Sequence, residues 1–161
     1  MTGLIIQIIR LLKILYTRWA IMKDTQKVFE PSCGDGNFVE EAIKAKLRAK
    51  ELGVNSTTIV NSDFFHYLNS NKASRYDAVL GNPPFIRYQS FPEEHRELAI
   101  SMMQNLGLKP NKLTNIWVPF LVISASLLKS TRRLAMVIPA ELFQVKYAAE
   151  TRVFLSNFSS K

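Results

Sequence analysis

The chain has 161 residues, 47% hydrophobic and 21% charged, which fits one folded domain with a real core and argues against a disordered chain. Lys and Arg outnumber Asp and Glu by 21 to 13, and the net charge of +8 suits a polyanionic partner. Because the basic residues are spread along the chain, a basic solvated surface is an equally good interpretation. The single cysteine, Cys33, excludes an internal disulfide and fits a reducing cytoplasm.

The first predicted element is an N-terminal helix. The apolar run from Leu4 to Leu15 is interrupted by Gln7, Arg10 and Lys13, too often for a bilayer span of about 20 apolar residues. It also lacks the small-residue cleavage site of a signal peptide. We expect residues 1–26 to form a packed amphipathic helix, with a helix lying on a membrane surface as the alternative.

The remainder, residues 27–161, predicts strands alternating with helices. The expected strands are at residues 27–30, 57–60, 76–80 and 133–138, and the expected helices at 37–53, 65–69, 92–106, 115–128 and 140–155. This order predicts an α/β fold with a parallel sheet and helices on both faces. Ligands in such sheets bind at the carboxyl ends of the strands, so residues 30–36, 63 and 82–85 should share one crevice.

The turn Asn82-Pro83-Pro84-Phe85 follows the third strand and Gly81. An exocyclic amine on an aromatic ring is a poor nucleophile, and hydrogen-bond acceptors aimed at its protons restore some reactivity. The Asn82 side chain and the Pro83 carbonyl offer such acceptors, and two successive prolines keep them in a stiff extended turn. The turn therefore indicates an amine-methylating active site, with Phe85 as a flat face for the base. The alternative is an ordinary chain break in an α/β loop.

Two more loops carry residues suited to a ligand. The segment Glu30-Pro31-Ser32-Cys33-Gly34-Asp35-Gly36 is a glycine-containing turn between a strand and a helix, which lets backbone N–H groups approach a ligand, although structural turns share the pattern. Asp63 could accept a hydrogen bond from an adenine amine, with Phe64 beside the ring. Taken alone, Asp63 is better interpreted as the N-cap of the next helix.

Together, these strings resemble the class I S-adenosylmethionine-dependent methyltransferases, most closely the adenine-N6 DNA methyltransferases of restriction-modification systems. The resemblance covers about residues 27–158 and rests on Glu30-Pro31-Ser32-Cys33-Gly34-Asp35-Gly36, Gly81-Asn82-Pro83-Pro84-Phe85-Ile86-Arg87-Tyr88-Gln89, Asn115-Ile116-Trp117-Val118-Pro119-Phe120 and Met136-Val137-Ile138-Pro139-Ala140-Glu141-Leu142-Phe143. It implies a Rossmann-like sheet, S-adenosylmethionine as cofactor, and methyl transfer to the N6 amine of an adenine flipped out of double-stranded DNA in the cytoplasm.

The resemblance also implies a role for each site residue. The methionine part of the cofactor would be held by Glu30, Pro31, Ser32, Cys33 and Gly34, and its adenine by Asp63 and Phe64. Asn82 and the Pro83 carbonyl would hold the target amine, Pro84 would stiffen the turn, and Phe85 would stack on the flipped base. Arg87 and Tyr88 would help to position the DNA, although Tyr88 could equally belong to the core. No metal and no membrane partner are expected.

The chain departs from the family pattern in three places. One helix and one strand fill the stretch from Asp35 to Asp63, where the family has a further strand ending in a ribose-binding acid, and Glu51 fits a solvated helix face better than that role. A Thr-Pro motif is not recognisable in residues 1–26. The second aromatic for the flipped base and a target-recognition domain are also missing. We expect a truncated catalytic core whose sheet lacks one early strand and the C-terminal strands, and an inactive isolated chain is an open alternative. A separate recognition or restriction subunit is a candidate partner.

Two alternatives remain. Methyltransferases acting on protein glutamine or on ribosomal guanine share the Asn-Pro-Pro-aromatic motif, but the continuation from Phe85 to Gln89 and the loop from Ser32 to Gly36 look like the DNA group. A non-catalytic remnant could bind DNA or a partner through its basic surface. Its DNA affinity would then depend on salt and not on Asn82.

Overall fold

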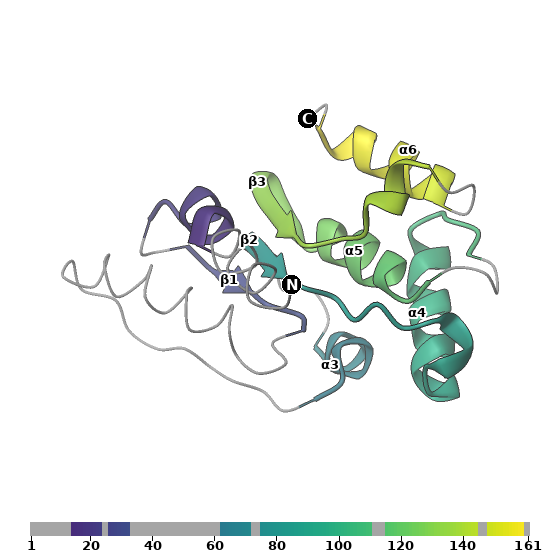
Figure 1. The fold of residues 1–161 in the computed structure, drawn as a ribbon. Coiled ribbons are helices and arrows are strands. Elements are labelled where there is room, and N and C mark those ends of the chain that lie inside the picture. Colours follow the sequence, from purple (N-terminus) through teal and green to yellow (C-terminus); the bar gives the residue numbers. More distant parts are fainter. Residues whose placement is uncertain are drawn as a thin grey trace, which may run out of the picture.

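The computed structural model describes residues 14–23, 26–32, 62–71, 75–110, 115–144 and 148–159. Within these ranges the chain forms a parallel sheet in the order β1-β2-β3, from strands β1 (Val28–Phe29), β2 (Tyr76–Gly81) and β3 (Leu128–Met136). Helices pack against this sheet (Figure 1), so the predicted α/β class with a parallel sheet is confirmed. Residues 1–13 and 33–61 lie outside the described residues. The predictions of a helix at 37–53, of a strand at 57–60 and of a missing strand before Asp63 fall on this second range.

Strand β2 is the central strand and is buried along its whole length. Its neighbours run parallel to it, with Val28 of β1 aligned with Ala78 and Ala135 of β3 aligned with Leu80. A strand that is paired on both edges and covered on both faces takes a continuous apolar run rather than an alternating pattern. The predicted strand at 76–80 is therefore confirmed, and it extends to Gly81 at the carboxyl end of the sheet.

The helices between the strands follow the sequence prediction closely. The described elements are α3 (Phe64–Ser70), α4 (Glu93–Asn105), α5 (Trp117–Ser126) and α6 (Ala149–Ser159), with the 3-10 segments η1 (Tyr88–Ser90) and η2 (Ala140–Phe143). The helices predicted at 65–69, 92–106 and 115–128 are confirmed within two residues at each end. Helix α4 starts after Pro92 with Glu93 and Glu94 in its first turn. Negative side chains stabilise a helix there, because they interact favourably with the positive end of its dipole.

Helices cover both faces of the described sheet (Figure 1). On one face, α5 is the core helix, because nine of its ten residues are buried. Around it lies the main cluster, which includes Phe64, Phe65, Met103, Phe120 and Leu142 from α3, α4, α5 and η2. On the other face, residues 14–20 are helical and the smaller cluster joins Ala20 and Ile21 to Ala78, Leu80 and Ala135. None of the helices in the described ranges has the length and apolar character that crossing a bilayer requires.

Strand β3 begins at Leu128, so the predicted start at Arg133 was wrong. Its first half is polar, which hides the strand from a search for apolar runs. The polarity has a structural cause, because Lys129 and Arg132 reach the carboxylate of Asp77 on β2 at 2.9 and 3.1 Å. The pairing of β3 with β2 shifts register between Tyr76 and Ala78, where the extra residues of β3 are accommodated.

The single helix predicted at 140–155 was also wrong. The chain forms η2 after Pro139 and then α6 from Ala149, a separate helix. In η2, the Leu142 amide donates to the Pro139 carbonyl at 3.1 Å, which is the tighter 3-10 pattern. The Leu142 carbonyl then accepts a hydrogen bond from the Arg152 guanidinium at 2.7 Å, so a side chain from α6 takes the group that a continuous helix would use.

Candidate functional site

The Asn82–Phe85 turn leaves the carboxyl end of β2 and is anchored at both ends. The Gly81 carbonyl accepts a hydrogen bond from the Val137 amide at 3.0 Å, just past β3, and the Ile86 carbonyl accepts one from the Ile116 amide at 3.2 Å, just before α5. Pro83 is buried, whereas Asn82 and Phe85 are exposed. The turn therefore presents an amide and an aromatic ring to solvent from a backbone held by the sheet and by the core helix.

The loop after β1 lies directly beside this turn. A Cβ on Gly81 would be 3.2 Å from Ser32 Oγ and 3.4 Å from Pro31 Cδ. The Oγ of Ser32 is buried and has no hydrogen-bond partner among the described residues, and both Glu30 carboxylate oxygens are shielded from solvent. The structure thus brings Glu30, Pro31 and Ser32 next to the turn, as parallel neighbouring strands require. Cys33 and Gly34, also assigned to this loop, lie outside the described residues.

This close approach predicts the effect of adding a methyl group at Gly81. We expect Gly81→Ala to lower stability by about 1 kcal/mol, because overpacking a tight contact forces its neighbours to move. For a chain of this size, that is a fall in Tm of about 2–4 °C. In the double variant Gly81→Ala/Ser32→Ala, the Tm measured by thermal unfolding should recover most of this fall. Tm changes that simply add up from the two single variants would contradict the contact.

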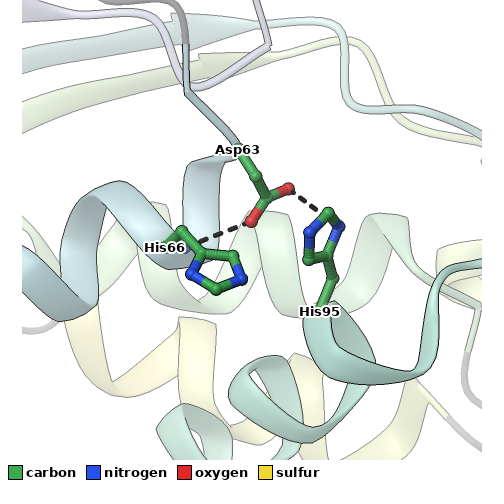
Figure 2. A group of neighbouring side chains, drawn as sticks. All are labelled: Asp63, His66 and His95. Atoms are coloured by element: carbon green, nitrogen blue, oxygen red, sulfur yellow. Dashed lines mark hydrogen bonds and ion pairs between the residues drawn. The ribbon is translucent and has the colours of Figure 1, made fainter.

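Asp63 is the N-cap of α3. Its Oδ1 accepts hydrogen bonds from the amides of Phe65 and His66 at 2.9 and 3.1 Å, which confirms the cap interpretation. Its Oδ2 lies 3.4 Å from His95 Nδ1, and 19% of the side chain is exposed (Figure 2). The cap thus uses one oxygen and leaves the other directed away from the helix.

Phe64 and the two residues assigned to DNA occupy different environments. Phe64 is 4% exposed and its ring stacks on Phe120 at 4.7 Å, so it belongs to the core between the sheet and α5. Its place beside a cofactor ring stays a prediction. The ring centroids of Phe64 and Phe29 are 6.1 Å apart. Asp63 precedes Phe64 in the chain and Glu30 follows Phe29, so this ring pair brings the two loops near each other. Arg87 is exposed two residues after Phe85, and Tyr88 opens η1.

Comparison with known proteins decides the family. The chain matches the Eco57I restriction-modification methylase model over residues 7–161. The chain belongs to the Eco57I restriction-modification methylase family. This confirms the resemblance to methyltransferases of restriction-modification systems that the sequence strings indicated.

Curated relatives agree with this family. The chain is 28% identical over 140 residues to the Type II methyltransferase M.HincII of Haemophilus influenzae and equally to M.HindII of the same species. It is 24% identical over 147 residues to the Type II methyltransferase M.AccI of Acinetobacter calcoaceticus. Each match covers 83% of this chain but only 26–27% of the relative, so the chain spans about a quarter of the length of these methyltransferases.

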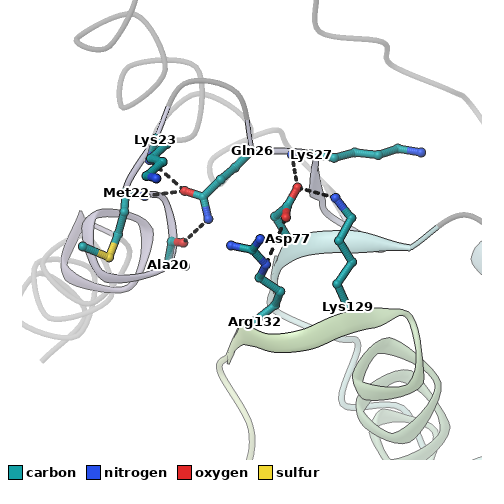
Figure 3. Close-up of polar contacts among 8 residues, drawn as sticks. All are labelled: Ala20, Met22, Lys23, Gln26, Lys27, Asp77, Lys129 and Arg132. Atoms are coloured by element: carbon teal, nitrogen blue, oxygen red, sulfur yellow. Dashed lines mark hydrogen bonds and ion pairs between the residues drawn. The ribbon is translucent and has the colours of Figure 1, made fainter.

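The structure of this methylase-family chain also reveals a buried charge cluster that sequence reasoning missed. Asp77, 6% exposed, lies on the central strand and accepts from the Lys27 amide at 2.8 Å and from Lys129 at 2.9 Å, with Arg132 at 3.1 Å (Figure 3). Burial alone raises the pKa of Asp77, but the hydrogen bonds and charges of these partners outweigh it and lower the pKa below its ordinary value. The available signal was an acid inside an otherwise apolar strand.

A second missed group lies next to Asp63. His66 on α3 and His95 on α4 bring their rings to a centroid distance of 5.1 Å, and His66 Nε2 is 3.2 Å from Glu94 Oε1. Neither histidine was predicted to have a role, because each stands alone in its own helix and only the packing of α3 on α4 joins them. The one local signal was the spacing from Asp63 to His66, which places both at the start of α3.

Proposed function

We propose that this chain carries the catalytic core of an S-adenosylmethionine-dependent DNA methyltransferase that acts on the N6 amine of an adenine flipped out of double-stranded DNA. The observation that carries the proposal is the anchored turn, which exposes Asn82 and Phe85 and follows Gly81, the residue next to Ser32, in a member of the restriction-modification methylase family. Its location at the carboxyl end of the central parallel strand is where ligands bind in such sheets.

The residues next to the turn fit the cofactor. The buried Ser32 Oγ has no hydrogen-bond partner among the described residues. Because Gly81 has no side chain, the space beside Ser32 Oγ that a Cβ would fill stays open. The shielded Glu30 carboxylate suits the positively charged amino group of a methionine moiety. Oδ2 of Asp63 suits an adenine amine. Glu30, Pro31, Ser32 and Asp63 would therefore hold S-adenosylmethionine, with Cys33 and Gly34 continuing the loop.

The turn supplies what the target amine needs. When bound, S-adenosylmethionine provides a methyl group on a positively charged sulfur, and the amine takes that methyl while the sulfur keeps the bonding electron pair. The Asn82 side-chain oxygen and the Pro83 carbonyl would accept hydrogen bonds from the amine, which raises electron density on its nitrogen. An amide is too weak a base to retain the proton that the nitrogen then loses, so this proton passes to solvent.

Exposed apolar groups after Asn82 suit a flipped base. Phe85 is 52% exposed and Ile86 38% exposed, and Arg87 is exposed directly after them. Stacking of a base on an aromatic side chain is worth about 1–3 kcal/mol. Phe85 would stack on the adenine while Arg87 contacts the phosphate backbone, where a cation favours binding without reading sequence.

The test combines cofactor binding with product analysis. Calorimetric titration with S-adenosylmethionine should show saturable binding, and incubation with unmethylated DNA and methyl-labelled cofactor should transfer label that chromatography of the digested DNA assigns to N6-methyladenine. Label on cytosine, on RNA or on protein would contradict the substrate. A failure to bind the cofactor, or binding without transfer, would contradict the proposed activity of this chain.

Asp63 can be tested separately because its cap and its proposed ligand role respond differently to substitution. Asp63→Asn should keep the stability of the fold within a few tenths of a kcal/mol, since Asn is an equally good N-cap. It should weaken S-adenosylmethionine binding about tenfold, because a charge-assisted acceptor for the adenine amine is lost. Thermal unfolding and calorimetry measure the two effects. Unchanged cofactor affinity would contradict a role of Asp63 in binding the cofactor.

A further inference from the structure

Both histidines of the chain converge on the carboxylate of Asp63. One ligand atom from each of Asp63, His66 and His95 lies within 4.8 Å of the others. The three side chains come from the N-cap and first turn of α3 and from the first turn of α4, and they face one another (Figure 2). Residues that are far apart in the chain thus gather two imidazoles and one carboxylate at the junction of two helices.

The hydrogen bonds around the cluster leave its inner atoms available. The cap occupies Asp63 Oδ1, whereas Oδ2 is 3.4 Å from His95 Nδ1, longer than a good hydrogen bond. His66 is oriented from outside by Glu94, whose Oε1 is 3.2 Å from Nε2. A carboxylate that holds a histidine ring in this way is typical of the residues around a metal ligand.

We propose that Asp63, His66 and His95 bind a transition-metal cation of the zinc class. Two imidazoles and a carboxylate with a fourth position left open form a common zinc ligand set, whereas magnesium and calcium prefer oxygen ligands alone. Ligand atoms about 2.1 Å from a tetrahedral zinc ion lie about 3.4 Å apart, so a cluster whose ligand atoms lie within 4.8 Å of one another has to close by about 1 Å. The side chains of Asp63, His66 and His95 are 19%, 38% and 26% exposed, which allows both entry of the ion and this adjustment.

The metal would join the first turns of α3 and α4. An ion that binds the folded chain and not the unfolded chain raises the stability of the fold. At a zinc concentration 100 times the dissociation constant, the expected rise in Tm is about 5–10 °C. Zinc and the adenine amine would compete for Oδ2 of Asp63, because the helix cap occupies Oδ1. The zinc site does not rest on methyl transfer, since zinc binding is measured without cofactor and without DNA.

The experiment titrates the metal-free chain with Zn²⁺ and follows its imidazole protons by NMR. Since the chain has only two histidines, both signals can be assigned and should shift together with one equivalent of zinc. Calorimetry should give a stoichiometry of one. With Co²⁺ in place of zinc, the spectrum should be that of nitrogen and oxygen ligands without thiolate charge transfer, which excludes binding at Cys33. Mg²⁺ should shift neither signal.

Variants then assign the ligands. His66→Gln and His95→Gln should each weaken zinc binding more than about tenfold and remove the rise in Tm. Glu97→Gln, an exposed acid on the same α4 but outside the cluster, should leave both unchanged. Histidine signals that do not respond to zinc in the unsubstituted chain would overturn the proposal, whatever the variants do. Retained binding in either histidine variant would also overturn it.

Discussion

Asn82→Ala should lower the rate of methyl transfer about 10²–10³-fold, the usual cost of removing one hydrogen-bond group that acts in the transition state. The fold should tolerate the change, because Asn82 is exposed and the turn is anchored through the Gly81 and Ile86 carbonyls instead. Affinity for S-adenosylmethionine should stay the same, since Asn82 is not among the residues proposed to bind it. The loss should therefore appear in kcat.

The measurement is the single-turnover rate of label transfer to DNA, together with cofactor titration by calorimetry. Asn105→Ala is the matched control, because Asn105 is an exposed asparagine at the end of α4 and is not part of the turn. It should transfer at the unsubstituted rate. Asn82→Asp keeps an acceptor oxygen and should retain more activity than Asn82→Ala. Equal rates for Asn82→Ala and the unsubstituted chain would show that this turn is not the active site.

The same variant separates catalysis from simple DNA binding. In a non-catalytic DNA-binding protein, salt would weaken DNA affinity because it makes the release of counterions from the DNA less favourable, and Asn82→Ala would leave that affinity unchanged. In the proposed enzyme, transfer falls while the electrostatic part of DNA binding remains. Transfer and DNA affinity therefore have to be measured on the same samples at two salt concentrations.

Local sequence signals predicted the centre of the fold well. The run from Tyr76 to Leu80 is apolar enough to fix a buried central strand, and Gly81 with two prolines fixes where it must end. Parallel topology then brought the end of β1 next to that of β2, which the contact between Ser32 and Gly81 bears out. These features depend on backbone preferences and on a simple rule of sheet geometry, both of which a sequence carries.

Long-range charge contacts were not predictable in this way. The polar residues Lys129 and Arg132 hide the first half of β3, and their role becomes visible only when Asp77 lies opposite them. The grouping of His66 with His95 depends on how α3 packs on α4, which no local pattern reports. The sequence therefore predicted the turn and its neighbouring loop but missed two clusters made by side chains from separate elements.

Asp77→Ala is expected to have the largest effect on stability. Removing a buried carboxylate from its cations typically costs about 3–5 kcal/mol, because the partners lose their compensation. Lys129 and Arg132 are each 43% exposed and can regain water, so we expect the lower end, about 3 kcal/mol. Urea unfolding at pH 7 measures this. Glu97→Ala, which removes an exposed acid, should stay within about 0.5 kcal/mol of the unsubstituted chain.

The pH dependence gives an independent check on the same group. Because the folded chain lowers the pKa of Asp77, its contribution is fully present above the ordinary value of 3.8 and is lost as the pH falls through the lower folded value. Asp77→Asn keeps an acceptor for the Lys27 amide but carries no charge, so its stability should lack this acid-sensitive part. The difference in unfolding free energy between the unsubstituted chain and Asp77→Asn should therefore narrow in acid, below about pH 4. A constant difference across this range would mean that Asp77 stabilises the sheet by shape and hydrogen bonding rather than by its charge.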